Sequence, residues 1–183
     1  MGYWKIFMDS ETKAKIYIDG ANIFYIQKDI NFSIDWGKAE KYLRRSYNIS
    51  EVRYYTGIKK DDEKMANYLR YLDAIGFTVI TKPMKIIKID NNHPMAKLHN
   101  YSKIYKCNFD VEMTTDILLD RTNIDEIVLF SGDSDFNYLI KKLYTLGKKV
   151  RIFSSRKMLA WELKFSGAKY SFLEDIKNDI ERK

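Results

Sequence analysis

Short apolar runs alternate with longer amphipathic stretches along most of the chain. The short runs have the length and apolar character of buried β-strands, and they lie at Lys15–Ile18, Val52–Thr56, Phe77–Thr81, Ile127–Phe130, Val150–Phe153 and near Tyr170–Leu173. The amphipathic stretches have the spacing of helices with one buried face, and they lie at Asp35–Tyr47, Asp61–Ile75, Asp110–Leu119, Ser134–Leu146 and Lys157–Phe165. This alternation predicts an α/β fold in which helices connect the strands of a mainly parallel sheet.

One stretch interrupts the alternation. Met84–Asp90 and Tyr101–Cys107 have the pattern of two extended segments around a loop, Asn91–Asn100. Two extended segments joined in this way indicate a hairpin rather than a helical crossover. We therefore predict a β-ribbon inserted into the α/β fold.

The composition indicates a single packed domain in a reducing compartment. The chain has 183 residues, 45% of them hydrophobic, so it can bury a substantial core and we expect one domain over residues 1–183. Cys107 is the only cysteine, which excludes an internal disulfide. Met1–Lys13 carries charges and lacks a long apolar run, so we expect no signal peptide, no membrane span and a cytoplasmic location.

Charge is distributed unevenly along the chain. The formal net charge is +7, which favours polyanions as partners. Residues 109–135 hold eight acidic side chains and one basic side chain, whereas residues 136–161 hold seven basic side chains and no acid. Residues 82–106 hold six lysines and one acid. An acidic segment thus lies between two basic ones.

Acidic residues follow two of the predicted strands. Asp19 ends the first strand, and Asp133 and Asp135 follow the strand Ile127–Phe130. Because ligands bind beyond the carboxyl ends of the strands in open α/β sheets, we expect these side chains at one sheet edge, joined by Asp110 at the start of a helix. Four neighbouring carboxylates repel one another unless cations neutralise them. Mg²⁺ or Mn²⁺ takes oxygen ligands and can activate a phosphodiester for hydrolysis.

Each of these residues also has a purely structural interpretation. Asp19 can begin a turn with Gly20, and Asp133 can cap the helix that follows it. Capping alone does not require acids at two strand ends together with Asp110, so the metal site explains the set better. Glu112 and Asp120 are interpreted as a solvated helix stripe.

Three blocks together resemble the NYN domain of the PIN-like nuclease superfamily, which includes the LabA-like proteins. They are Asp19-Gly20-Ala21-Asn22, Lys106 with Phe109-Asp110-Val111 and Asp116, and Ser131-Gly132-Asp133-Ser134-Asp135-Phe136 followed by Gly147 and Val150. The resemblance covers about residues 15–173 and implies a PIN-like three-layer fold and metal-dependent cleavage of RNA, single-stranded or structured. It implies catalytic and metal-binding roles for Asp19, Asp110, Asp133 and Asp135, a ligand-orienting role for Asn22, and a second-ranked metal-binding role for Asp116.

Candidate substrate-binding residues extend beyond the acids. They are Asn22, Ser131, Lys106, Ser154, Arg151, Arg156 and Lys157. Arg151, Arg156 and Lys157 are placed where a strand ends and a helix begins, and we expect them to contact phosphate. The ribbon lysines, interleaved with Tyr101 and Tyr105, have two open interpretations: contacts to single-stranded RNA, or the usual guard on exposed sheet edges.

Several other function classes are excluded. The turn after the first strand has one glycine and a carboxylate, which does not suit a pyrophosphate-binding Rossmann turn, and no P-loop is present. Ala21 stands where an aspartyl phosphatase needs its second Asp. The remaining alternative is a catalytically inactive RNA-binding or protein-interaction module of the same fold. A homodimer is expected only by analogy with PIN-like proteins.

Overall fold

A six-stranded parallel sheet forms the centre of the protein. The structure is a computed structural model that describes residues 12–88 and 103–183. The strands of the sheet follow the order β3-β2-β1-β6-β7-β8, and each neighbouring pair is parallel. Their bounds are β1 (Lys13–Asp19), β2 (Asn48–Ile58), β3 (Thr78–Pro83), β6 (Glu126–Phe130), β7 (Lys149–Ser154) and β8 (Lys169–Phe172).

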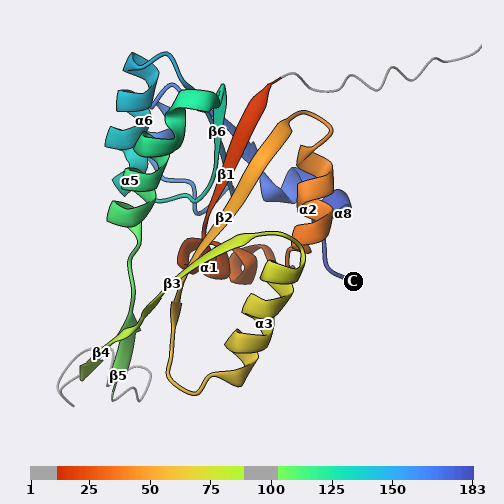
Figure 1. The fold of residues 1–183 in the computed structure, drawn as a ribbon, viewed down its shortest axis with the longest axis vertical. Helices are drawn as coiled ribbons and strands as arrows, with labels where there is room; N and C mark the ends of the chain where they lie inside the picture. Colours follow the sequence, from red (N-terminus) through yellow and green to blue (C-terminus); the bar gives the residue numbers. More distant parts are fainter. Residues whose placement is uncertain (1–11, 89–102) are drawn as a thin grey trace, which may run out of the picture.

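Helices cover both faces of the sheet, as Figure 1 shows. One face packs against α1 (Gly20–Ile30), α2 (Trp36–Leu43), α3 (Glu63–Ala74) and α8 (Lys177–Ile180), and the other against α5 (Asp110–Asp120), α6 (Asn137–Thr145) and α7 (Trp161–Lys164). The expected three-layer α/β architecture is therefore confirmed.

Alternating side chains of the central strands supply two separate cores. Ile16 and Ile18 of β1 pack with the first helix layer, around the buried Trp36 of α2. Tyr17, between them, points to the opposite face and packs with Met113 and Ile117 of α5. Because successive side chains of a strand point to opposite faces, a strand buried on both sides must be apolar throughout. This explains why the central strands appear in the sequence as short continuous apolar runs.

The strand order reverses between β1 and β6. From β1 the chain builds outward through β2 and β3 on one side, and from β6 through β7 and β8 on the other. Ile18 pairs with Phe130, so the residues that follow them, Asp19 and Ser131, lie side by side at the carboxyl edge. In open parallel sheets such a switch point leaves a crevice in which ligands bind.

The inserted ribbon is present as predicted. β4 (Lys85–Lys88) and β5 (Lys103–Lys106) form a two-stranded antiparallel sheet separate from the central one. In Figure 1 it projects from the body of the domain, continuing β3 and leading into α5. The predicted loop Asn91–Asn100, and Tyr101, lie outside the described residues.

Two helix predictions differ from the structure. The sequence pattern gave no helix after the first strand, yet α1 begins directly at Gly20. The predicted helix Lys157–Phe165 is regular only over the four residues of α7. The Ala160 amide donates a hydrogen bond of 2.9 Å to the Gly132 carbonyl, which ties this segment to the turn after β6.

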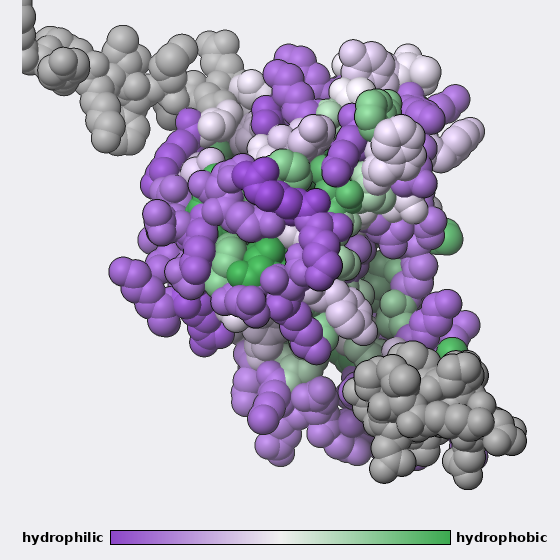
Figure 2. Space-filling model, turned by 180° about the vertical axis from the view of Figure 1, so that it is seen from behind, coloured by the Kyte–Doolittle hydropathy of each residue, from purple (hydrophilic) through white to green (hydrophobic). Residues whose placement is uncertain are grey.

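The surface is mainly hydrophilic on the face opposite to that of Figure 1. Figure 2 shows hydrophobic groups there in small separate patches. Among residues 12–88 and 103–183, no helix combines the length and the apolar character that crossing a membrane requires.

A network of charged side chains joins β1, β2 and α5. Glu51 accepts hydrogen bonds from Arg53 at 2.9 Å and Thr78 at 2.8 Å, and Lys15 lies 2.7 Å from its other oxygen. Lys15 and Arg53 also pair with Asp120 at 3.0 and 2.9 Å. Burial raises the pKa of Glu51, but the hydrogen bonds from Arg53, Lys15 and Thr78 outweigh it and hold that pKa at about 2.

This network predicts a specific loss of stability in acid. Since the folded pKa of Glu51 lies below its usual value of 4.5, its contribution is complete above pH 4.5 and is lost as the pH falls toward 2. We expect the free energy of unfolding of the wild type to fall more steeply across this window than that of Glu51→Gln. Denaturant titrations at several pH values measure both slopes, and equal slopes would contradict the assignment.

Candidate metal centre

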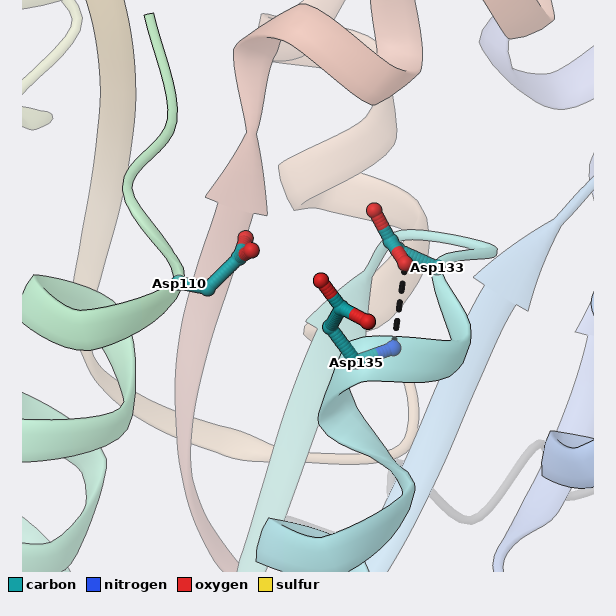
Figure 3. Close-up of side chains that lie close together, drawn as sticks. All are labelled: Asp110, Asp133 and Asp135. Atoms are coloured by element: carbon teal, nitrogen blue, oxygen red, sulfur yellow. Dashed lines mark hydrogen bonds between the residues drawn. The ribbon is translucent and has the colours of Figure 1, made fainter.

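Three aspartates converge at the switch point of the sheet. Asp110 begins α5, and Asp133 and Asp135 lie in the turn after β6, which contains the 3-10 turn η2 (Ser134–Phe136). One carboxylate oxygen from each lies within 4.8 Å of the other two. Figure 3 shows the three side chains pointing toward one another from these two elements. Carboxylate oxygens in such a group are the donors that Mg²⁺ and Mn²⁺ prefer.

Local hydrogen bonds fix two of these carboxylates. The Asp135 amide donates to Asp133 Oδ1 at 3.0 Å, which is the capping interaction that the sequence allowed for. Asn108 holds Asp110 from both sides, because its side-chain amide donates to the carboxylate and its Oδ1 accepts from the Asp110 backbone N–H at 2.7 Å. Within residues 12–88 and 103–183, no hydrogen bond reaches Asp133 Oδ2. That oxygen is available to a ligand.

Asp19 lies behind this group rather than within it. Its Oδ1 caps α1 by accepting from the Asn22 amide at 3.1 Å, and its Oδ2 accepts from Ser131 Oγ at 3.2 Å. Ser131 Oγ in turn accepts from the Asp133 amide at 3.2 Å. Asp19 is thus connected to Asp133 through one buried hydroxyl group. Of the four predicted catalytic aspartates, Asp110, Asp133 and Asp135 bring their carboxylate oxygens together. The fourth, Asp19, supports the turn after β6 through Ser131.

Two of the four carboxylates, those of Asp19 and Asp110, have raised pKa values. Burial raises the pKa of Asp19 to about 6, and the charges of Asp110 and Asp133 add to the effect. Burial also raises the pKa of Asp110, with further contributions from Asp133 and Asp135. In the part of the chain that the structure describes, no lysine or arginine forms an ion pair with any of the four. The group therefore concentrates negative charge that a divalent cation would neutralise.

Gly132 allows the turn to pack closely against the segment after β7. A Cβ atom at this position would lie 2.2 Å from the Met158 carbonyl oxygen and 2.5 Å from Ser154 Oγ. The Gly132 amide donates to Asn22 Oδ1 at 2.9 Å. Asn22 and Ser131, which we predicted as substrate contacts, thus use these oxygens to hold the turn that carries Asp133 and Asp135.

Asp116 is not brought to the aspartate cluster. It accepts a hydrogen bond of 2.7 Å from Tyr55 Oη and lies 3.3 Å from Arg53. The interpretation of Asp120 as a solvated charge is wrong, because its carboxylate pairs with Arg53 and accepts from Tyr17 Oη at 3.1 Å. Both residues face inward from α5 toward the half-buried guanidinium group of Arg53 on β2 and have a structural role there.

The predicted basic contacts lie at different distances from the sheet edge. Arg151 is in the middle of β7, where its Nε donates to Tyr47 Oη at 2.8 Å and lies 3.4 Å from Glu126. Arg156 and Lys157 follow β7 and are exposed, and Lys157 pairs with Asp29 at 2.8 Å.

Ser154 ends β7 and is buried. Its Oγ has no hydrogen-bond partner among the described residues.

Lys106 is exposed at the end of β5, four residues before Asp110. Asn108, between them, is the site residue that the sequence analysis missed. A signal was available, because the side chain of an Asn in a turn commonly accepts a hydrogen bond from the backbone two residues further on, as Asn108 does from Asp110.

Comparisons with known proteins match most of the chain. The family model described as the NYN domain matches residues 13–174. Over 173 residues the chain is 31% identical to the low amplitude and bright protein LabA of Synechococcus elongatus, covering 93% of this chain and 89% of that protein. A crystal structure of a protein of unknown function from Vibrio parahaemolyticus has a similar fold, with a TM-score of 0.72 and 20% identity over 95% of this chain and 98% of that one.

The cluster predicts stabilisation by divalent cations. Mn²⁺ or Mg²⁺ should raise the melting temperature of the wild type, by the equivalent of about 2.7 kcal/mol when the free ion is 100-fold above its dissociation constant. Asp110→Asn should melt higher than the wild type in EDTA, because repulsion is relieved, and should lose most of the metal-induced rise. Asp73→Asn, an exposed acid on α3, is the control and should keep the full response. An undiminished metal response in Asp110→Asn would contradict the site.

The packing at Gly132 predicts the effect of one added methyl group. Gly132→Ala should lower the free energy of unfolding by about 1–3 kcal/mol, because the added Cβ overlaps the Met158 carbonyl. Gly37→Ala is the matched control: its Cβ meets nothing closer than 3.4 Å, so the better helix former should be neutral or stabilising. Urea denaturation measures both, and equal stabilities would refute the tight turn.

Proposed function

The chain belongs to the NYN domain family, and from that premise we propose that it is a metal-dependent ribonuclease that hydrolyses RNA phosphodiester bonds. The observation that carries the proposal is the convergence of Asp110, Asp133 and Asp135 at the switch point, with no cationic side chain of the described residues paired to them. A cluster of like charges in which Asp110 and Asp133 are half-buried is costly to maintain, so its presence favours a function for the charge.

The residues present fit a hard divalent cation. Asp110, Asp133 and Asp135 offer oxygen atoms only, and the free Oδ2 of Asp133 faces no competing donor among the described residues. We propose that these three side chains hold Mg²⁺ or Mn²⁺, and that Asp19 supports them through Ser131. A cation held there would polarise a phosphodiester and make water a stronger nucleophile.

The chain's own residues would position the RNA. The scissile phosphate would lie over the carboxyl edge, where Asp110 faces Asp133 and Asp135. Lys106, Arg156 and Lys157 are exposed near the ends of the elements that frame this edge, and we propose them as phosphate contacts. Basic side chains at such positions neutralise the RNA backbone and so hold the strand against the repulsion of the aspartates.

Cleavage assays test the proposal. Wild-type protein with Mn²⁺ or Mg²⁺ should cleave an end-labelled RNA, and EDTA should stop the reaction. Asp133→Asn and Asp19→Asn should reduce cleavage to background, because one removes a ligand and the other disturbs the turn that carries it. RNA binding should survive or strengthen in both, since a repulsive charge is removed. Asp73→Asn should cleave like the wild type.

One result would favour a different function. If wild-type protein binds RNA but cleaves none with either metal, and both Asn variants behave like wild type in every assay, the domain is a binding module that keeps the fold without the chemistry. Binding without cleavage is therefore the outcome that refutes the ribonuclease.

A further inference from the structure

The β4–β5 ribbon places lysines directly opposite one another. In its antiparallel register Lys85 pairs with Lys106, and Lys88 pairs with Lys103. Between these pairs lie two apolar pairs, Ile86 with Tyr105 and Ile87 with Ile104. Since residues directly opposite in an antiparallel pair share a face, each face of the ribbon carries one lysine pair and one apolar pair.

This arrangement is unfavourable in the isolated protein. Like charges directly opposite each other destabilise an antiparallel pair, and none of the four lysines forms an ion pair with a described residue. Lys82, just before the ribbon, contrasts with them because it pairs with Glu112. A polyanion that bridges the paired lysines would relieve the repulsion.

The base of the ribbon is fixed to the central sheet. The Met84 amide donates to the Ile58 carbonyl at 2.9 Å. Gly57 of β2 has no side chain where Cys107 and Met84 approach, and a Cβ there would lie 2.6 Å from Cys107 Cβ and 2.8 Å from Met84 Cγ. The ribbon is thus packed onto β2 at the two points where it leaves and re-enters the domain.

The ribbon also lies close to the metal centre along the chain. Lys106 precedes Asp110 by four residues, a span of at most about 14 Å even if fully extended. Figure 1 shows β5 running directly to the start of α5. A strand of RNA bound to the ribbon is therefore within a few nucleotides of the aspartates.

Exposed apolar side chains complete the surface. Tyr105 is 44% and Ile86 58% exposed, and Lys59 Nζ lies 4.0 Å from the centre of the Tyr105 ring. Basic groups interleaved with an exposed aromatic ring are typical of proteins that bind single strands, whose unpaired bases can stack. A second copy of the ribbon would bring eight lysines together, so self-association does not suit this surface.

We propose that the β4–β5 ribbon binds single-stranded RNA, with its paired lysines on the phosphates and Tyr105 against a base, and guides the strand to the aspartate centre. The guiding role rests on the proposed function, because it requires that the aspartate centre acts on RNA. Binding of RNA to the ribbon does not depend on cleavage.

Two double variants test the proposal without threatening the fold. Lys85→Gln/Lys106→Gln and Lys88→Gln/Lys103→Gln each remove one repulsive pair, so both should melt no lower than the wild type. Binding of a fluorescent oligouridine of about 12 nucleotides is measured by anisotropy in EDTA, where cleavage is absent. At about 0.1 M salt each double variant should bind several-fold more weakly than wild type, and the combined quadruple variant about tenfold or more. The salt dependence of the quadruple variant should be shallower by about 3 in log K against log salt.

Two control variants separate the effect of the ribbon lysines from the effect of the protein's overall positive charge. Lys64→Gln/Lys141→Gln/Lys142→Gln/Lys164→Gln removes the same charge from exposed helix positions without described ion pairs, and it should bind nearly as well as the wild type. A quadruple Lys→Arg ribbon variant should restore binding.

Three outcomes would overturn the ribbon assignment. They are unchanged RNA binding by the ribbon variants, an equal loss in the helix-position control, and ribbon-dependent binding to anionic phosphatidylserine vesicles with none to RNA. If the wild type cleaves no RNA with Mn²⁺ or Mg²⁺ but binds RNA through the ribbon lysines, the ribonuclease is refuted and the RNA-binding role of the ribbon still stands.

Discussion

Aspartates at one edge of the sheet repel one another, and the elements around them must hold them together against that repulsion. Asp110, Asp133 and Asp135 bring oxygens within 4.8 Å of one another, and Asp19 lies just behind them. Because no described lysine or arginine pairs with these groups, packing interactions elsewhere in the domain must offset the repulsion among the carboxylates. Several hydrogen bonds accordingly hold the turn after β6. They come from Asn22, from Ser131 and from the segment after β7.

The topology explains why residues more than 100 positions apart meet. β1 and β6 are neighbours at the switch point, with Ile18 level with Phe130, so Asp19 and the turn after β6 emerge together. The ribbon then sets the position of Asp110, because β5 leads directly into α5 and is packed onto β2 at Gly57. The same insertion therefore positions Asp110, which we propose as a metal ligand, and carries four lysines that form no ion pair with a described residue.

Local patterns predicted the strands and most helices, and long-range contacts explain what they missed. The helix α1 was missed because Phe24 and Tyr25 are exposed beside the buried Ile23 and Ile26, so apolar residues occur on both sides and blur the helical period. The acids at the strand ends were recognisable from the sequence. Which acids join the cluster and which have a structural role was not recognisable from the sequence. The structural role of Asp116, for example, depends on Arg53 and Tyr55, which are distant in sequence.

Anomalous diffraction from a crystal of the protein with manganese would locate the ion directly. We expect a peak bounded by the carboxylates of Asp110, Asp133 and Asp135, with Asp19 next to it and hydrogen-bonded to Ser131. Manganese bound elsewhere, with this group of carboxylates empty at saturating ion, would contradict the proposed metal site.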